Sequence, residues 1–340
     1  MTRAATVLAN TLINHGVDRV FCVPGESYLA LIDALYDTPD IDVVTARHEG
    51  GASFMAVADA KITGKPGIVM VSRGPGATNA TIGIHVSQQD AVPVIMFVGQ
   101  VSREDRGRGA FQEIDYVKTY SDMTKWVIEV SDADKISECV QRAFVIAQSG
   151  TPGPVIISLP EDMLLDETNI PALTPVVISQ PKPNMSDILK ICEMIAIAKR
   201  PLIIAGGQIG GSAGRNALRT VSETWDIPVA TAWRHQDLFN TNHPNFSCHL
   251  AFNMPPIFKE TLNESDLIIG IGTRLGDVVT QGYKIPSAPQ PIQKLIHIYN
   301  DTKPLGKVFQ TDLAIVADAT KTLELIATID PPEIPKERPD

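Results

Sequence analysis

The chain alternates short, uninterrupted apolar runs with longer stretches that carry apolar residues at helical spacing, and this alternation limits the folds open to it. In the first half, the apolar runs are typical of buried strands and occupy residues 20–23, 42–46, 67–72, 93–99 and 154–159. Helix-like stretches lie between them, at residues 2–15, 27–36, 49–64, 76–89 and 131–149. Strands that are apolar on both faces and alternate with helices form a parallel sheet that helices cover on both sides. The first half therefore predicts a doubly wound α/β domain.

The sequence changes in texture near residue 166, and a second alternating region follows. Residues 166–184 are rich in proline and lack periodicity, which is typical of a linker between domains. Beyond them, strand-like runs recur at residues 201–205, 228–231, 267–271 and 294–299. We predict a first domain at 1–165, this linker, a second doubly wound domain at 185–330 and a further linker at 331–340.

Composition excludes several classes of partner. The chain has a net charge of −10, so it lacks the basic surface that binds nucleic acids or anionic membranes. Its four cysteines form no CxxC pair, which indicates reduced thiols and not a zinc site or a disulfide framework. The first twenty or so residues lack a signal-peptide layout, and the apolar run at 92–98 is far too short to cross a bilayer. We expect a cytoplasmic protein with neither a nucleic-acid nor a membrane partner.

Four short segments with turn-forming or polar residues follow the predicted strands of the first domain. They are residues 23–26 (VPGE), 47–49 (RHE), 72–79 (SRGPGATN) and 109–113 (GAFQE). Taken singly, each has an ordinary explanation as a turn, a flexible connection or a helix start favoured by the helix dipole. Because ligands bind where the carboxyl ends of parallel strands meet, the four segments together predict a binding site.

In this order and spacing, the segments resemble the pyrimidine-binding domain of thiamine-diphosphate enzymes, and most of all the acetolactate synthase branch. The resemblance extends to residues 89–101 and 151–163 and through the second domain, so it covers nearly the whole chain. It implies thiamine diphosphate as cofactor, with Glu49 and Gln112 as catalytic residues. The cofactor-binding positions that it implies are Pro24, Gly25, Glu26, Glu49, Gly74, Pro75, Gly76, Thr78, Asn79, Phe111 and Gln112.

The residue types suit the chemistry that the resemblance implies. A carboxylate at Glu49 can share a proton with the ring nitrogen of the cofactor's aminopyrimidine, whose exocyclic nitrogen then takes the thiazolium proton. Glycines such as Gly25 and Gly76 let the backbone approach the ring closely. Residues 106–111 lack the adjacent histidines with which decarboxylase relatives protonate the intermediate, and this favours carbon–carbon bond formation. Glu49 also argues against the glyoxylate carboligase branch, which lacks this glutamate.

The second domain poses a separate question, that of a bound nucleotide. Its segment 206–211 (GGQIGG) is not a GxGxxG fingerprint, and a loose turn is a serious alternative. The resemblance implies FAD across the strand ends, although some relatives bind ADP there and others bind nothing, so the choice stays open. The matching positions are Gly206, Gly207, His249, Leu250, Gly272, Thr273, Arg274, Asn300 and Asp301.

The signature for metal binding is missing. Family members hold the cofactor's diphosphate through Mg²⁺ in a third domain, marked by Gly-Asp-Gly, whereas Gly276-Asp277 continues here with Val278. We therefore predict no metal ligands within the chain. We expect the Mg²⁺ ligands from a domain supplied downstream or by a separate chain, and no activity from the 340 residues alone. The resemblance also implies a homodimer or tetramer.

The leading hypothesis is a carboligase of the acetolactate synthase type. Such an enzyme decarboxylates one 2-oxoacid and joins the remainder to a second, most simply two pyruvates giving acetolactate and CO₂. Two alternatives stay open: another thiamine-diphosphate lyase or acyltransferase, and a non-catalytic homologue that keeps the scaffold for binding or assembly. The sequence leaves the substrate undecided, because the missing domain would build much of the acceptor pocket.

Overall fold

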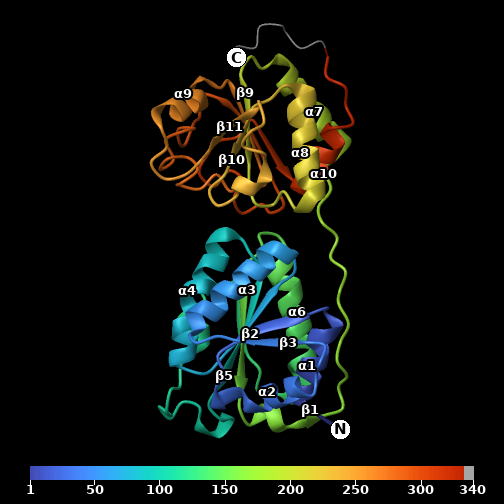
Figure 1. The fold of residues 1–340 in the computed structure, drawn as a ribbon, viewed down its shortest axis with the longest axis vertical. Helices are drawn as coiled ribbons and strands as arrows, with labels where there is room; N and C mark the ends of the chain where they lie inside the picture. Colours follow the sequence, from blue (N-terminus) through green and yellow to red (C-terminus); the bar gives the residue numbers. More distant parts are fainter. Residues whose placement is uncertain (333–340) are drawn as a thin grey trace. The chain divides into compact units, whose positions relative to one another are not determined.

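The computed structural model describes residues 1–332, and the chain forms two compact units, Met1–Ile178 and a second that begins at Ser179 (Figure 1). Each unit is built on a six-stranded sheet in which all neighbouring strands are parallel. The predicted fold class, two doubly wound α/β domains, is confirmed. Of the predicted terminal linker, residues 333–340 lie outside the described residues. In the described part of the chain, no helix is long and apolar enough to cross a membrane.

The first sheet has the strand order β3–β2–β4–β5–β7–β6. Its strands are β2 (Arg19–Cys22), β3 (Asp42–Thr45), β4 (Gly67–Val71), β5 (Val94–Gln100), β6 (Trp126–Glu129) and β7 (Pro154–Pro160). One face packs against α1 (Ala4–Asn14), α2 (Leu29–Tyr36) and α6 (Ile136–Gln148), and the other against α3 (Glu49–Thr63), α4 (Pro75–Asp90) and α5 (Tyr116–Tyr120). The central strands are apolar throughout because a helical layer covers each of their faces.

Helices α3 and α4 lie side by side (Figure 1) and pack closely because small residues line their contact. A Cβ on Gly83 of α4 would lie 2.3 Å from the Ser53 hydroxyl oxygen of α3. A Cβ on Gly67, at the start of β4, would lie 2.0 Å from the Ala56 carbonyl oxygen of α3. These contacts fix α3 against both the sheet and α4, and so determine where the first turns of the two helices lie.

Residues 166–178, predicted to be linker, lie on the first unit. Strand β8 (Glu167–Thr168) forms a short antiparallel pair with β1 (Thr2–Arg3). Further along, the Ser137 hydroxyl donates to the carbonyl of Pro171 (2.7 Å), and the Gln141 amide donates to that of Thr174 (2.8 Å). The segment around Pro171 and Thr174 has no regular secondary structure to pair its carbonyl groups. Side chains of α6 supply hydrogen bonds to them instead.

The second sheet has the strand order β11–β10–β9–β12–β13–β14. Its strands are β9 (Pro201–Ala205), β10 (Val229–Thr231), β11 (Phe246–His249), β12 (Leu267–Ile271), β13 (Lys294–Tyr299) and β14 (Leu313–Val316). The helices of this unit are α7 (Met185–Ile197), α8 (Gly211–Trp225), α9 (Pro256–Glu264) and α10 (Ala319–Ile326). Helices α7, α8 and α10 cover one face of the sheet, while α9 and the long loops cover the other.

Candidate functional site

The four predicted segments of the first unit meet at the carboxyl edge of its sheet. The chain leaves β2 toward β3 on one side and later enters β4 on the other, so the strand order reverses between β2 and β4. Such a reversal opens a crevice at the carboxyl ends of the strands. Gly25 follows β2 and Ser72 follows β4, and a Cβ on Gly25 would lie 2.5 Å from the Ser72 Cβ. The loops beside the crevice are therefore in direct contact.

Glu49 and Asn79 come together from two different helices at this edge. Glu49 is the first residue of α3, and its Oε2 accepts a hydrogen bond of 3.0 Å from the Asn79 amide of α4. A Cβ on Gly76 would lie 2.5 Å from the Ser72 hydroxyl oxygen and 3.2 Å from Glu49 Oε1, so the glycine makes room for Ser72 and brings backbone close to the carboxylate. His48 caps α3, since its Nδ1 accepts the Gly50 N–H at 3.0 Å. The cap orients the helix start from which the Glu49 side chain emerges.

The segment with Gln112 reaches the same edge from the end of β5. Gln112 has a φ of 65°, in the left-handed region, and its backbone packs against Gly74, whose own φ is 56°. A Cβ on Gly74 would lie 2.8 Å from the Gln112 Cβ and 2.9 Å from the Gln112 carbonyl oxygen. Only a glycine at position 74 allows this approach. Phe111 lies next to this contact, with 78% of its surface exposed.

Tyr116, which sequence reasoning missed, joins three parts of this edge. Its hydroxyl oxygen accepts the Gly74 N–H (3.0 Å), and its O–H donates to the Gly99 carbonyl at the end of β5 (3.2 Å). Burial raises the pKa of Tyr116 to about 12, so the phenol keeps the proton that this second bond needs. No spacing or motif marks this tyrosine, because its role depends on where its hydroxyl points after folding.

The remaining predicted positions stand further from the carboxylate. Pro24 and Glu26 are exposed, with Glu26 starting a short 3₁₀ helix (Glu26–Tyr28). Pro75 is the first residue of α4, where proline has no N–H to leave unpaired. The Thr78 hydroxyl donates to the Gly74 carbonyl at 3.0 Å and so bonds within its own helix. In the described part of the chain, no hydrogen bond joins these four residues to the side chain of Glu49 or Asn79.

The predicted nucleotide positions of the second unit also share one edge. Its strand order reverses between β9 and β12, and a Cβ on Gly206, after β9, would lie 2.5 Å from the Gly272 carbonyl oxygen, after β12. Thr273 beside it is buried and Arg274 is exposed. After β13, the Asn300 N–H donates to the Gln208 side chain at 3.1 Å, and Asp301 follows.

Two of these nucleotide positions are already in contact with protein groups. A Cβ on Gly207 would lie 2.3 Å from the His235 ring, so that glycine accommodates a histidine of its own unit. His249, the last residue of β11, has its Nδ1 3.1 Å from the Thr231 hydroxyl, and the buried Leu250 follows it. The edge gathers the predicted residues, and protein groups fill part of the space between them.

Two family models match the chain. One, described as the N-terminal TPP binding domain of thiamine pyrophosphate enzymes, matches residues 2–119, and the other, described as their central domain, matches residues 188–326. The two matches fall on the two units of the structure, in the same order. The chain belongs to the thiamine pyrophosphate enzyme family.

Curated members of this family with similar sequences are named as acetolactate synthase subunits. The large subunit from Lactococcus lactis is 33% identical over 329 residues, which are 95% of this chain and 56% of that protein. The isozyme 3 large subunit from Escherichia coli is 31% identical over 330 residues, 95% and 57% of the two chains. The mitochondrial catalytic subunit from Saccharomyces cerevisiae is 32% identical over 327 residues, 91% and 48%. The chain spans about half the length of these relatives.

In this member of the thiamine pyrophosphate enzyme family, the residues around Glu49 fit the aminopyrimidine half of the cofactor. Among residues 1–332, Asn79 supplies the one hydrogen bond to the Glu49 carboxylate, through Oε2, and Oε1 has no hydrogen-bond partner. That oxygen is available to a ring nitrogen. The diphosphate half of the cofactor has no such match, since the described residues contain no group of three or more histidine, cysteine, aspartate or glutamate side chains placed to hold a metal ion.

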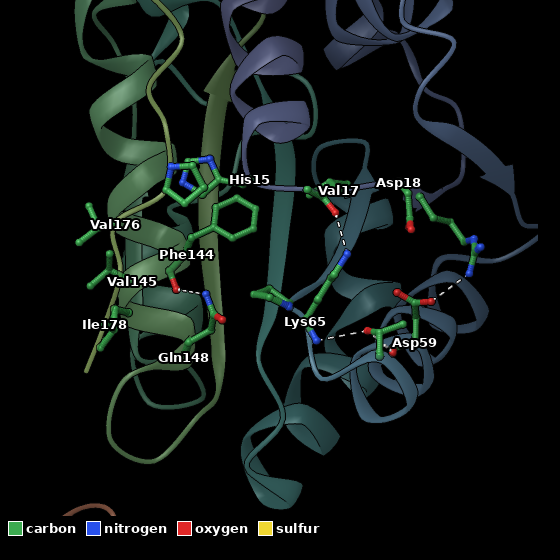
Figure 2. A pocket seen from close by; sticks show the side chains of 15 residues that line it. His15, Val17, Asp18, Asp59, Lys65, Phe144, Val145, Gln148, Val176 and Ile178 are labelled. Carbon is green, nitrogen blue, oxygen red and sulfur yellow. Dashed lines mark hydrogen bonds and ion pairs between the residues drawn. The ribbon is translucent and has the colours of Figure 1, made fainter. Parts of the chain in front are cut away.

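A cavity of about 220 Å³ lies elsewhere on the first unit, at the amino ends of its strands (Figure 2). Its lining includes His15 and Phe144 on one side and Lys65 and Asp59 on the other. The loops before β2 and β4 and the end of α6 form its walls. The cavity lies at the amino ends of the strands, whereas the site around Glu49 lies at their carboxyl ends, where parallel sheets bind ligands. The two are therefore distinct.

The surroundings of His15 in this cavity disfavour its charged form. Its Nδ1–H donates to the Thr11 carbonyl (2.8 Å), its ring stacks on Phe144, and its buried Nε2 has no hydrogen-bond partner among the described residues. Burial lowers the pKa of His15 from 6.5, and the bond to Thr11 opposes this shift. The neutral ring therefore contributes stability above pH 6.5, and that stability is lost as the pH falls from 6.5 through the lower pKa of the folded state.

We expect His15→Asn to reduce this loss of stability in acid, because asparagine does not titrate. The measurement is the urea midpoint of unfolding of each protein at pH 7.5 and at pH 5.5.

Two other histidines with lowered pKa do not affect the comparison of wild type with His15→Asn. Burial also lowers the pKa of His249 and of His297, and both residues are present in wild type and variant, so their contributions cancel in the difference. Equal changes of midpoint with pH in the two proteins would contradict the role given to His15.

Proposed function

We propose that this chain supplies the aminopyrimidine-binding part of a thiamine-diphosphate-dependent carboligase of the acetolactate synthase type, which converts two pyruvates to acetolactate and CO₂. The observation that carries the proposal is the 3.0 Å contact between the Glu49 carboxylate and the Asn79 amide, beside the Cβ-free backbone of Gly76. The names of the relatives, acetolactate synthase subunits, support the reaction, and the match to the N-terminal TPP binding domain supports the cofactor.

The residues of the site have distinct roles in this proposal. Glu49 holds and exchanges a proton at the ring nitrogen of the aminopyrimidine, while Asn79 orients the carboxylate through Oε2. Gln112 lies on the substrate side, held there by its backbone contact with Gly74. When bound, thiamine diphosphate supplies a carbon nucleophile for attack on the 2-oxoacid. Arg106 in the neighbouring loop is ion-paired with Glu113 and Glu129, and its guanidinium keeps its proton, so it does not act as an acid toward a carbon centre.

The rest of the enzyme completes the site in this proposal. A further domain holds the cofactor's diphosphate through Mg²⁺. It would supply the oxygen ligands that Mg²⁺ prefers. We also propose that the first unit self-associates as a homodimer or tetramer. Helices α3 and α4, which carry Glu49 and Asn79, expose Phe54 (42%) and Ile82 (54%), and such apolar side chains favour a protein contact.

The test of this proposal separates binding from turnover. Calorimetric titration of the chain with thiamine, which carries the aminopyrimidine without a diphosphate, should show binding that Glu49→Gln weakens. Acetolactate should form from pyruvate, thiamine diphosphate and Mg²⁺ only when a diphosphate-binding domain is supplied. Acetolactate made by the 340-residue chain alone, and lost in Glu49→Gln, would show that the diphosphate binds elsewhere than proposed.

We propose in addition that the second unit binds FAD or ADP at its carboxyl edge. A ligand that binds only the folded state stabilises it, by about 2.7 kcal/mol at 100 times its Kd. We expect FAD or ADP at saturating concentration to raise the melting temperature by several degrees, and flavin to remain with the protein as a yellow colour after gel filtration if FAD is the ligand. A melting temperature that neither nucleotide changes would contradict this proposal.

A further inference from the structure

The loop between β5 and α5, residues 101–115, is held to the sheet by a network of charges. Arg106 donates through Nε to Glu129 (2.9 Å), the last residue of β6, and through a terminal nitrogen to Glu113. Glu129 also accepts a bond of 3.3 Å from the fully buried Gln100 at the end of β5. Arg106 is thus bonded to the end of β6, and through Glu129 it is linked to the end of β5, while one terminal nitrogen bonds Glu113.

Glu113 in turn folds the tip of this loop. Its two carboxylate oxygens accept the backbone N–H groups of Gly107 (2.7 Å) and Ala110 (3.2 Å), in addition to the Arg106 guanidinium. Its side chain is only 12% exposed. The bond from Gly107, the largest influence, helps to lower the pKa of Glu113, so the carboxylate is ionised at neutral pH. Hydrogen bonds to an ionised acceptor are the strong ones among side-chain contacts.

The residues on either side of Glu113 touch the same turn of the candidate site. Gln112, immediately before it, packs its backbone on Gly74 with a φ of 65°. Tyr116, three residues after it, bonds the Gly74 N–H through its hydroxyl. The Glu113 carboxylate fixes the loop between these two residues. It therefore helps to determine where Gln112 and Tyr116 contact Gly74.

We propose that Glu113 is a positioning residue, which holds Gln112 and Tyr116 against the Gly74 turn and thereby shapes the aminopyrimidine pocket. The identity of the ligand rests on the proposed function. The positioning of Gln112 and Tyr116 rests on the loop geometry alone. Glu113 does not contact the cofactor in this account. It acts through the backbone of its own loop.

The test uses the full chain and three variants. Glu113→Gln keeps the size of the side chain and removes its charge, and Glu113→Asp keeps the charge on a shorter arm. Glu104→Gln is the matched control, because Glu104 is an exposed carboxylate of the same loop. Amide hydrogen exchange at Gly107 and Ala110 reports whether the loop keeps its hydrogen bonds, and titration with thiamine reports the affinity of the pocket.

In Glu113→Gln we expect exchange at Gly107 and Ala110 to accelerate, and thiamine affinity to fall, each by about tenfold or more, as loss of a bond to a charged group implies. Glu113→Asp should recover part of both, and Glu104→Gln should change neither. Unchanged exchange in Glu113→Gln, or faster exchange with unchanged thiamine affinity, overturns the proposal. Loss of protection throughout the first unit overturns it also, because the carboxylate would then support the whole fold. If wild type binds no thiamine, the proposed function fails, and the exchange measurement still decides whether Glu113 fixes the loop.

Discussion

A Glu49→Gln substitution is expected to slow exchange of the thiazolium proton by about 100-fold or more in the completed enzyme, the effect of losing a positioned proton-transfer group. Glutamine has the same shape, and its amide oxygen can still accept the Asn79 bond, so the local packing should survive. What the variant lacks is an ionisable oxygen beside Gly76 that can share a proton with the pyrimidine ring. Deuterium exchange of the bound cofactor, followed by quenched NMR, measures this step directly.

The matched control for this variant is Glu138→Gln. Glu138 is an exposed glutamate in the first turn of α6, so its substitution removes a charge of the same sign from a helix start of the same unit. Its proton exchange should equal that of wild type. If Glu49→Gln also exchanges at the wild-type rate, Glu49 is not the proton-transfer group and the site must be sought elsewhere.

The interior strands of the two six-stranded sheets could be predicted closely from the sequence, whereas three of the four edge strands could not; the exception is β3 (Asp42–Thr45), predicted at 42–46. The runs at 201–205, 267–271 and 294–299 coincide with β9, β12 and β13, because helices cover both faces of these strands and demand apolar residues throughout. Strands β6, β11 and β14 were not predicted. They lie at the edges of their sheets, where Trp126–Glu129 is half-buried along its length and Val316 is 41% exposed. Partial exposure removes the continuous apolar run that identifies a strand.

The same distinction holds at the site. Glu49 and the glycines at 25, 74 and 76 could be found because the chemistry demands particular residue types at the ends of strands, and the structure brings them together. Glu113 could not be found in this way, because its importance comes from a loop that folds back so that one carboxylate reaches two of its own N–H groups. No local sequence pattern specifies that return.

Gly67 carries the other large expected effect, and its position explains why. It starts β4 directly beneath α3, and a Cβ there would lie 2.0 Å from the Ala56 carbonyl oxygen and 2.7 Å from its carbonyl carbon. Both atoms belong to the helix backbone, so no rotation of a side chain can relieve the overlap. The helix itself must move away from the sheet, and Glu49 at its first turn must move with it.

We therefore expect Gly67→Ala to destabilise the first unit by about 3 kcal/mol, at the upper end of overpacking costs, and to weaken thiamine binding as well. Urea titration followed by hydrogen-exchange mass spectrometry resolves the two units, and only the transition of the first should shift. The matched control is Gly51→Ala on the same helix, where a Cβ meets nothing within 4 Å. Alanine there should be neutral or stabilising by about 0.5 kcal/mol, since it lowers the entropy of the unfolded chain. Equal stability of the Gly67 and Gly51 variants would mean that α3 does not rest on β4 through backbone contact, and the placement of Glu49 would need another explanation.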